Sequence, residues 1–113
     1  ELLKRSGAKK IVFSTWGVRE GLLYDLLSPF SKQEDPLISS CVEMSEHNGR
    51  HPAYAADLFD WTASFFPNET TAQQRLRLAA CILNEIAWRI YRPARAEWAY
   101  NWVIQSSLVG MTH

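Results

Sequence analysis

Apolar residues recur at helical spacing along most of this chain. They stand three or four positions apart in residues 18–27, 36–48, 54–66, 71–90 and 98–109. This spacing places apolar side chains on one face of an α-helix. Prolines and Asn-Gly or Pro-Asn pairs separate the stretches. The pattern therefore predicts a mainly α protein, with about five helices packed as a bundle.

Two of the expected helices carry the strongest apolar faces. In the third, one face carries Tyr54, Leu58, Trp61 and Phe65, and a parallel stripe widens it with Ala55, Phe59 and Phe66. We therefore expect this helix to be central. The fourth is the longest, and one continuous stripe along it is expected to be buried: Leu76, Ala79, Ala80, Leu83, Ile86, Ala87 and Ile90. The opposite face, expected in solvent, holds Arg77, Glu85, Arg89 and Arg92.

Short local motifs predict where two of the helices begin and where one strand lies. Asp35 before Pro36 is typical of an N-cap followed by proline at the first helical position. Thr70 or Thr71, with Gln73 or Gln74 three residues on, fits a capping box at the start of the longest helix. The short apolar run 11–13 predicts a strand or its remnant near the N-terminus.

Composition narrows the class of protein. Lys plus Arg and Asp plus Glu number 12 each, and this zero net charge argues against general nucleic-acid binding. No apolar run is long enough to span a membrane, and the start has neither a signal-peptide architecture nor a Met. We therefore expect a piece of a longer cytoplasmic protein. Cys41 and Cys81 lie in apolar helical patterns, which favours free buried thiols over a disulfide.

No catalytic or metal-binding constellation is evident. The spacing of His47, His51 and His113 matches no usual metal-ligand pattern, which favours loop, cap and surface roles. Neither cysteine has a histidine at a helical neighbour position, so core packing is the favoured reading for both. We therefore assign no catalytic residue and no metal ligand in this chain.

An arginine cluster is the one candidate site. Residues 75–95 contain five arginines and a single acidic residue, Glu85. One reading is a solvated helix face in which Glu85 pairs with Arg89. The other is a patch that holds a polyanion, because guanidinium groups suit phosphate oxygens. Arg89, Arg92 and Arg95, which cluster around Pro93, are our candidate substrate-binding residues.

Residues 10–27 contain the motif Gly17-Val18-Arg19-Glu20-Gly21-Leu22-Leu23-Tyr24. This stretch resembles the strand, turn and helix that close the second actin-like domain of the exopolyphosphatase / guanosine pentaphosphate phosphatase family. Residues 75–113 are similar to the helical domain that follows, in Leu83-Asn84-Glu85-Ile86-Ala87-Trp88-Arg89, Arg95-x-Glu97 and Val109-Gly110-x-x-His113. The segment 57–62 supports the register between them.

The resemblance implies two parts: residues 1–28 as the end of the actin-like domain, and residues 29–113 as a helical domain related to histidine–aspartate (HD) phosphohydrolases. The full-length reaction would remove the terminal phosphate of polyphosphate or guanosine pentaphosphate, with a carboxylate-activated water and a divalent metal such as magnesium. The family's catalytic carboxylates and phosphate loops lie upstream of the matched region. This chain alone is therefore expected to be non-catalytic and to carry no cofactor.

The resemblance also bears on partners and alternatives. The HD metal pair corresponds here to Asn84 and Glu85, and Asn84 is a poor metal ligand, which disfavours an active HD phosphohydrolase. Expected partners are the protein's own actin-like domains and the parent's polyphosphate or guanosine pentaphosphate. A homodimer contact is another role open to the helical domain, and neither nucleic acid nor membrane is expected. The alternative function is a stand-alone helical interaction module without phosphate chemistry.

Overall fold

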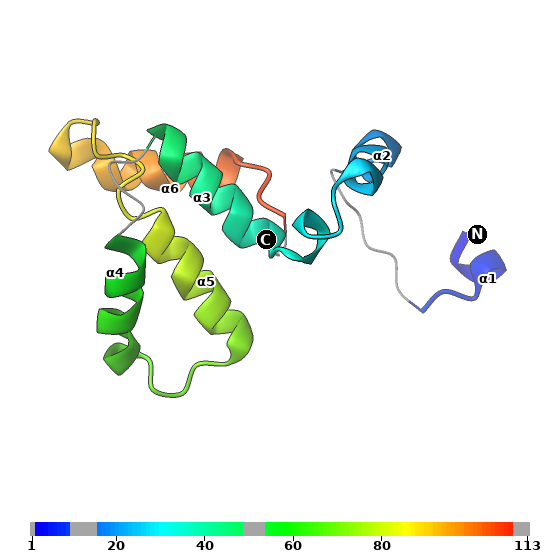
Figure 1. Cartoon of the computed structure of the whole chain (residues 1–113), viewed down its shortest axis with the longest axis horizontal. Helices are drawn as coiled ribbons and strands as arrows, with labels where there is room; N and C mark the ends of the chain where they lie inside the picture. The colour runs from blue at the N-terminus through cyan, green and yellow to red at the C-terminus, as the bar shows by residue number, and fades with distance from the viewer. Residues whose placement is uncertain (1, 10–15, 49–53, 110–113) are drawn as a thin grey trace. The chain divides into compact units, whose positions relative to one another are not determined.

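The computed structural model describes residues 2–9, 16–48 and 54–109. This part of the chain holds six α-helices, three short 3₁₀ helices and no β-strand (Figure 1). The mainly α, bundle-type fold predicted from the apolar spacing is confirmed. The strand expected at 11–13 lies outside the described residues.

The chain divides into two compact units, Glu1–Gln33 and Glu34–His113. The first contains α1 (Leu2–Ser6), α2 (Val18–Leu26) and the 3₁₀ helix η1 (Ser31–Gln33). Helix α2 buries none of its residues, although its apolar spacing is helical. The division falls near the boundary expected at 28/29, and the relation of the first part to an actin-like domain stays a prediction.

The second unit contains the buried core. Its elements are α3 (Pro36–Asn48), α4 (Tyr54–Thr62), η2 (Ala63–Phe65), α5 (Thr71–Ile82), η3 (Arg92–Ala94) and α6 (Arg95–Gln105). Helices α4 and α5 form a hairpin, and α3 packs against α5 (Figure 1). The core cluster consists of Leu37, Cys41, Ala55, Ala79, Ile82, Leu83, Ile86 and Ala87.

Both predicted helix starts are confirmed. The backbone N–H of Leu37 donates to Asp35 Oδ1 at 2.9 Å, which caps α3. At α5, the N–H of Gln73 donates to Thr70 Oγ1 at 3.3 Å and the N–H of Thr70 donates to Gln73 Oε1 at 2.8 Å. This reciprocal pair is the capping box, and it satisfies two backbone donors that the first helical turn leaves free.

The longest helix ends earlier than predicted. Helix α5 stops at Ile82, and successive turns follow, in which the N–H groups of Ile86 and Trp88 donate to carbonyls three residues back, each at 3.1 Å. An apolar period shows which residues share a face but does not fix where the helix ends. Here the turns bring Leu83, Ile86 and Ala87 into the core. The continuous stripe expected from residue 76 to 90 is therefore wrong as one helix face.

The positions of the predicted stripe differ in their burial. Ala79, Leu83, Ile86 and Ala87 are buried as expected. Leu76 keeps 46% of its surface exposed and Ala80 is exposed, so these two were misplaced. Arg77, expected in solvent, is largely covered. The reason is that α4 packs along the Arg77 side of α5, a choice of neighbour that the period of α5 alone does not specify.

The apolar face predicted for α4 is buried only in part. Ala55 is buried, and Phe59 is partly buried on the side turned toward α5, where its ring lies against Arg77. The larger aromatic members of the predicted face, Tyr54, Trp61 and Phe65, are exposed to 67%, 66% and 61%. Helix α4 has apolar residues around most of its circumference, so the widest aromatic stripe need not face the core.

Candidate functional site

Arg89 and Arg92 lie in the segment that joins α5 to α6. Both side chains are exposed. The guanidinium of Arg89 lies 5.2 Å from the centre of the Trp88 ring, a cation–π contact, and no ion pair joins it to Glu85 in the described part of the chain. Arg92 is the first residue of η3, which runs directly into α6. Both cationic side chains therefore face solvent from the short segment between α5 and α6.

Arg95 has a different environment from the other two. Its Nε donates to the carbonyl of Ile90 at 2.9 Å, and its terminal nitrogen Nη2 donates to the carbonyl of Trp88. These carbonyls belong to the turns after α5, where helical partners are missing. The Arg95 guanidinium therefore stabilises the segment between α5 and α6, in which Arg89 lies. The three predicted arginines lie in one segment of the sequence, and Arg95 differs from the other two in making hydrogen bonds within that segment.

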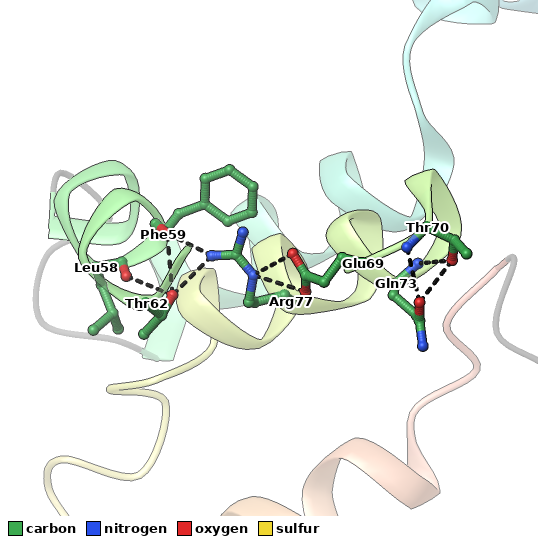
Figure 2. A network of polar contacts seen from close by, with 7 residues as sticks. All are labelled: Leu58, Phe59, Thr62, Glu69, Thr70, Gln73 and Arg77. Atoms are coloured by element: carbon green, nitrogen blue, oxygen red, sulfur yellow. Dashed lines mark hydrogen bonds and ion pairs between the residues drawn. The ribbon is translucent and has the colours of Figure 1, made fainter. Parts of the chain in front are cut away.

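A second arginine site was missed by the sequence reasoning. Arg77 Nε donates to both carboxylate oxygens of Glu69 at 2.9 Å, and Nη1 donates to Thr62 Oγ1 at 2.8 Å and to the carbonyl of Phe59 (Figure 2). The guanidinium carbon lies 3.9 Å from the Phe59 ring centre. Only 10% of the Arg77 side chain and 8% of the Glu69 side chain are exposed, so this is a buried ion pair.

The Arg77 network closes the α4–α5 hairpin. Thr62 Oγ1, which accepts from Arg77, donates in turn to the carbonyl of Leu58 at 2.8 Å (Figure 2). Glu69 lies in the connection just before Thr70, and so the guanidinium ties the end of α4 to the loop that leads into α5. The spacing between 69 and 77 crosses a helix start, so no helical i, i+4 rule reveals the pair.

A third arginine, Arg75, anchors the start of α3. Its Nη2 donates to Asp35 Oδ1 at 2.7 Å and its Nε donates to Oδ2, a two-point contact between α5 and the α3 cap. The Arg75 hydrogen bond lowers the pKa of Asp35, and the N–H of Leu37 adds to the effect. The same contact raises the pKa of Arg75. Arg75 and Arg77 are thus used inside the fold, which leaves Arg89 and Arg92 as the solvent-facing members.

The lowered pKa of Asp35 predicts a pH dependence of stability. The ionised carboxylate is favoured in the folded state, so its contribution is present above the unfolded pKa of about 3.9 and is lost as pH falls through the lower folded value. We expect a contribution of about 1 kcal/mol at most, because the pair is partly solvated. Asp35→Asn keeps a capping oxygen and removes the charge.

Urea unfolding at pH 7 and at pH 3 measures this effect. The difference in unfolding free energy between the wild type and Asp35→Asn should be present at pH 7 and should shrink below pH ~4. A difference of the same size at both pH values would show that the carboxylate charge contributes nothing.

Other candidate chemistry is limited in the described part of the chain. No group of three or more His, Cys, Asp or Glu side chains there could hold a metal ion. Asn84 is exposed and Glu85 partly buried, in the turns after α5. His47 Nδ1 lies 2.8 Å from the carbonyl of Glu43 in its own helix. The predicted roles of His51 and His113 concern positions outside the described residues.

Both cysteines are free and buried, as predicted. Cys41 is fully covered in the core cluster, and burial raises the pKa of its thiol. A raised pKa keeps the thiol protonated and therefore a weak nucleophile. The cysteines thus act as small apolar core residues. No helix in the described residues is long and apolar enough to cross a membrane.

The structure defines a small helical domain in which the segment between α5 and α6 carries exposed arginines. Comparison with known protein families identifies the family of this domain. The family model described as "Exopolyphosphatase, C-terminal" matches residues 37–113, which is most of the chain. The chain therefore belongs to the exopolyphosphatase C-terminal family, in agreement with the resemblance found in the sequence. No curated protein matches the chain.

Proposed function

We propose that this chain is the non-catalytic helical part of an exopolyphosphatase and that it binds the polyanionic phosphate chain for its parent. The observation that supports this role is the segment 86–96, which contains three arginines and no acidic residue. Arg89 and Arg92 would contact phosphate oxygens, and Arg95 would hold the segment in place. The parent's hydrolysis of polyphosphate or guanosine pentaphosphate, with a metal such as magnesium, would take place on its actin-like domains.

The helix geometry favours an anion at this segment more than the sequence suggested. A continuous helix from 71 would have put these arginines near a helix C-terminus, the end that disfavours anions. In the structure η3 leads into α6, so Arg92 lies at the N-terminal end of a helical run. The positive end of the helix dipole lies there, and its field adds to that of the guanidinium groups.

Binding of long-chain polyphosphate to the whole chain tests the role of Arg89 and Arg92. The double variant Arg89→Gln/Arg92→Gln should weaken binding about tenfold or more at low salt, because charge-assisted hydrogen bonds to phosphate are lost. Its thermal midpoint should change little, since both side chains are exposed. The salt dependence of affinity should become shallower, because fewer counterions are released.

Lys9→Gln/Arg19→Gln is the matched control, with the same loss of charge at two exposed residues of the first unit. Equal weakening in both double variants would mean that only net charge matters and would refute a site. Phosphate release from polyphosphate or guanosine pentaphosphate is measured in the same samples. We expect none, and turnover abolished by a change within this chain would contradict the non-catalytic role.

The exposed aromatic residues of α4 and η2 support a second candidate, an interaction module without phosphate chemistry. Tyr54, Trp61 and Phe65 are all more than half exposed, and aromatic residues are enriched at protein interfaces. This candidate predicts no measurable polyphosphate binding at low salt. The binding experiment therefore separates the two functions. For the parent we propose a cytoplasmic setting, because two free thiols fit a reducing compartment.

A further inference from the structure

The outward side of α3 carries an unusual charge pattern. Residues 34–48 contain Glu34, Asp35, Glu43 and Glu46 and neither lysine nor arginine. Asp35 is paired with Arg75. The three glutamates form no ion pair with any residue in the described part of the chain. Among the described residues, three carboxylates without an ion pair make this part of the second unit locally negative.

Two apolar side chains lie among these carboxylates. A shallow, open hollow is lined by Glu34, Ile38, Ser39, Val42, Glu43 and Glu46. Ile38 and Val42 are one helical turn apart and only partly buried, with their inner sides packed against the core. We call Glu34, Ile38, Val42, Glu43 and Glu46 the acidic α3 surface. Apolar side chains flanked by charged ones are the kind of composition that an interaction site has.

We propose that the acidic α3 surface docks a basic amphipathic helix of a partner protein. Apolar side chains of the partner lie on Ile38 and Val42, and its Lys or Arg side chains reach Glu34, Glu43 and Glu46. The apolar anchors of an amphipathic helix recur one turn apart, which matches the spacing of Ile38 and Val42. Helix α3 has 13 residues and is ~20 Å long, so a partner helix of three to four turns matches it.

The charge of the surface selects this occupant over others. A phosphate polyanion is repelled by three unpaired carboxylates, and so is an anionic lipid surface. A basic helix gains electrostatic attraction, which speeds association and fixes register. The proposal rests on residues 34–46, so it stands or falls independently of polyphosphate binding at Arg89 and Arg92. A second copy of the chain, presenting its arginine segment, is the competing occupant.

The test uses the whole chain and a synthetic, fluorescently labelled 14-residue peptide of leucine and lysine in helical amphipathic order. We expect binding by anisotropy at low salt. The triple variant Glu34→Gln/Glu43→Gln/Glu46→Gln should weaken it at least about tenfold. The control variant Asp57→Asn/Asp60→Asn/Glu97→Gln removes the same charge from three exposed acidic residues elsewhere and should bind like the wild type.

Two further measurements separate docking from general attraction. A scrambled peptide of equal composition should bind more weakly than the ordered peptide. The variant Val42→Thr, which keeps the side-chain volume, should weaken binding of the ordered peptide and leave binding of the scrambled peptide unchanged. Equal loss in both triple variants, or equal binding of the scrambled peptide, overturns the proposal. So does self-association of the chain without peptide that the α3 triple variant abolishes, because the surface would then belong to a second copy.

Discussion

Replacing Arg77 with methionine should lower the unfolding free energy of the second unit by about 3–5 kcal/mol. The change leaves the Glu69 carboxylate in a site where its side chain is only 8% exposed, without the cation that contacts both of its oxygens. It also removes the donor to Thr62 Oγ1 and the stacking on Phe59. Because small domains have only about 5–15 kcal/mol of stability, much of it would disappear.

Urea unfolding followed by circular dichroism measures this loss. The double variant Arg77→Met/Glu69→Leu should recover much of it, since a buried pair replaced as a whole is often tolerated. The difference between the sum of the single changes and the double change gives the coupling free energy. Arg89→Met, at an exposed position, is the matched control and should stay within about 0.5 kcal/mol. A loss below 1 kcal/mol for Arg77→Met would contradict a buried ion pair.

The second large effect is expected at Leu83. This side chain is 8% exposed and lies in the core cluster beyond the end of α5. Leu83→Ala should lower the unfolding free energy by about 2–5 kcal/mol, the cost of removing buried methyl groups and leaving a cavity. Leu76→Ala is the control, because Leu76 is 46% exposed and should cost about 1 kcal/mol or less.

The losses of unfolding free energy at these two leucines distinguish a helix that ends at Ile82 from the longer helix expected from the sequence. A single stripe along one long helix would bury both and give similar losses. In the structure α5 ends between them, and only the residue in the turns faces the core. Similar losses at both positions would therefore favour the uninterrupted helix.

Helix starts could be predicted from the sequence because they depend on neighbouring residues. Asp35 and Thr70 act within three positions of the backbone groups they cap, so the local sequence contains the whole interaction. The exposed position of Arg89 and Arg92 follows from their charge, because an unpaired guanidinium group is rarely buried. The family resemblance was also readable, since its motifs are short and local.

The rest depends on contacts between segments. The exposed stripe of α4 and the early end of α5 both result from how α4, α5 and the following turns pack, which a period of 3.6 residues does not determine. Arg77 looked solvated because its partners, Glu69 and the end of α4, are not at helical neighbour positions. The role of Arg95 depends on carbonyls of Trp88 and Ile90 that become available only outside a helix.

The two-sided contact of the Arg77 guanidinium constrains which residues can replace it. Its edge meets two carboxylate oxygens, a hydroxyl and a carbonyl, while its flat face lies on the Phe59 ring. A lysine ammonium supplies the same charge from one point, with three donors and no flat face. Lysine is therefore not a conservative replacement here. Natural variants that keep Glu69 and Phe59 should keep arginine at 77, whatever substitutions the exposed arginines accept.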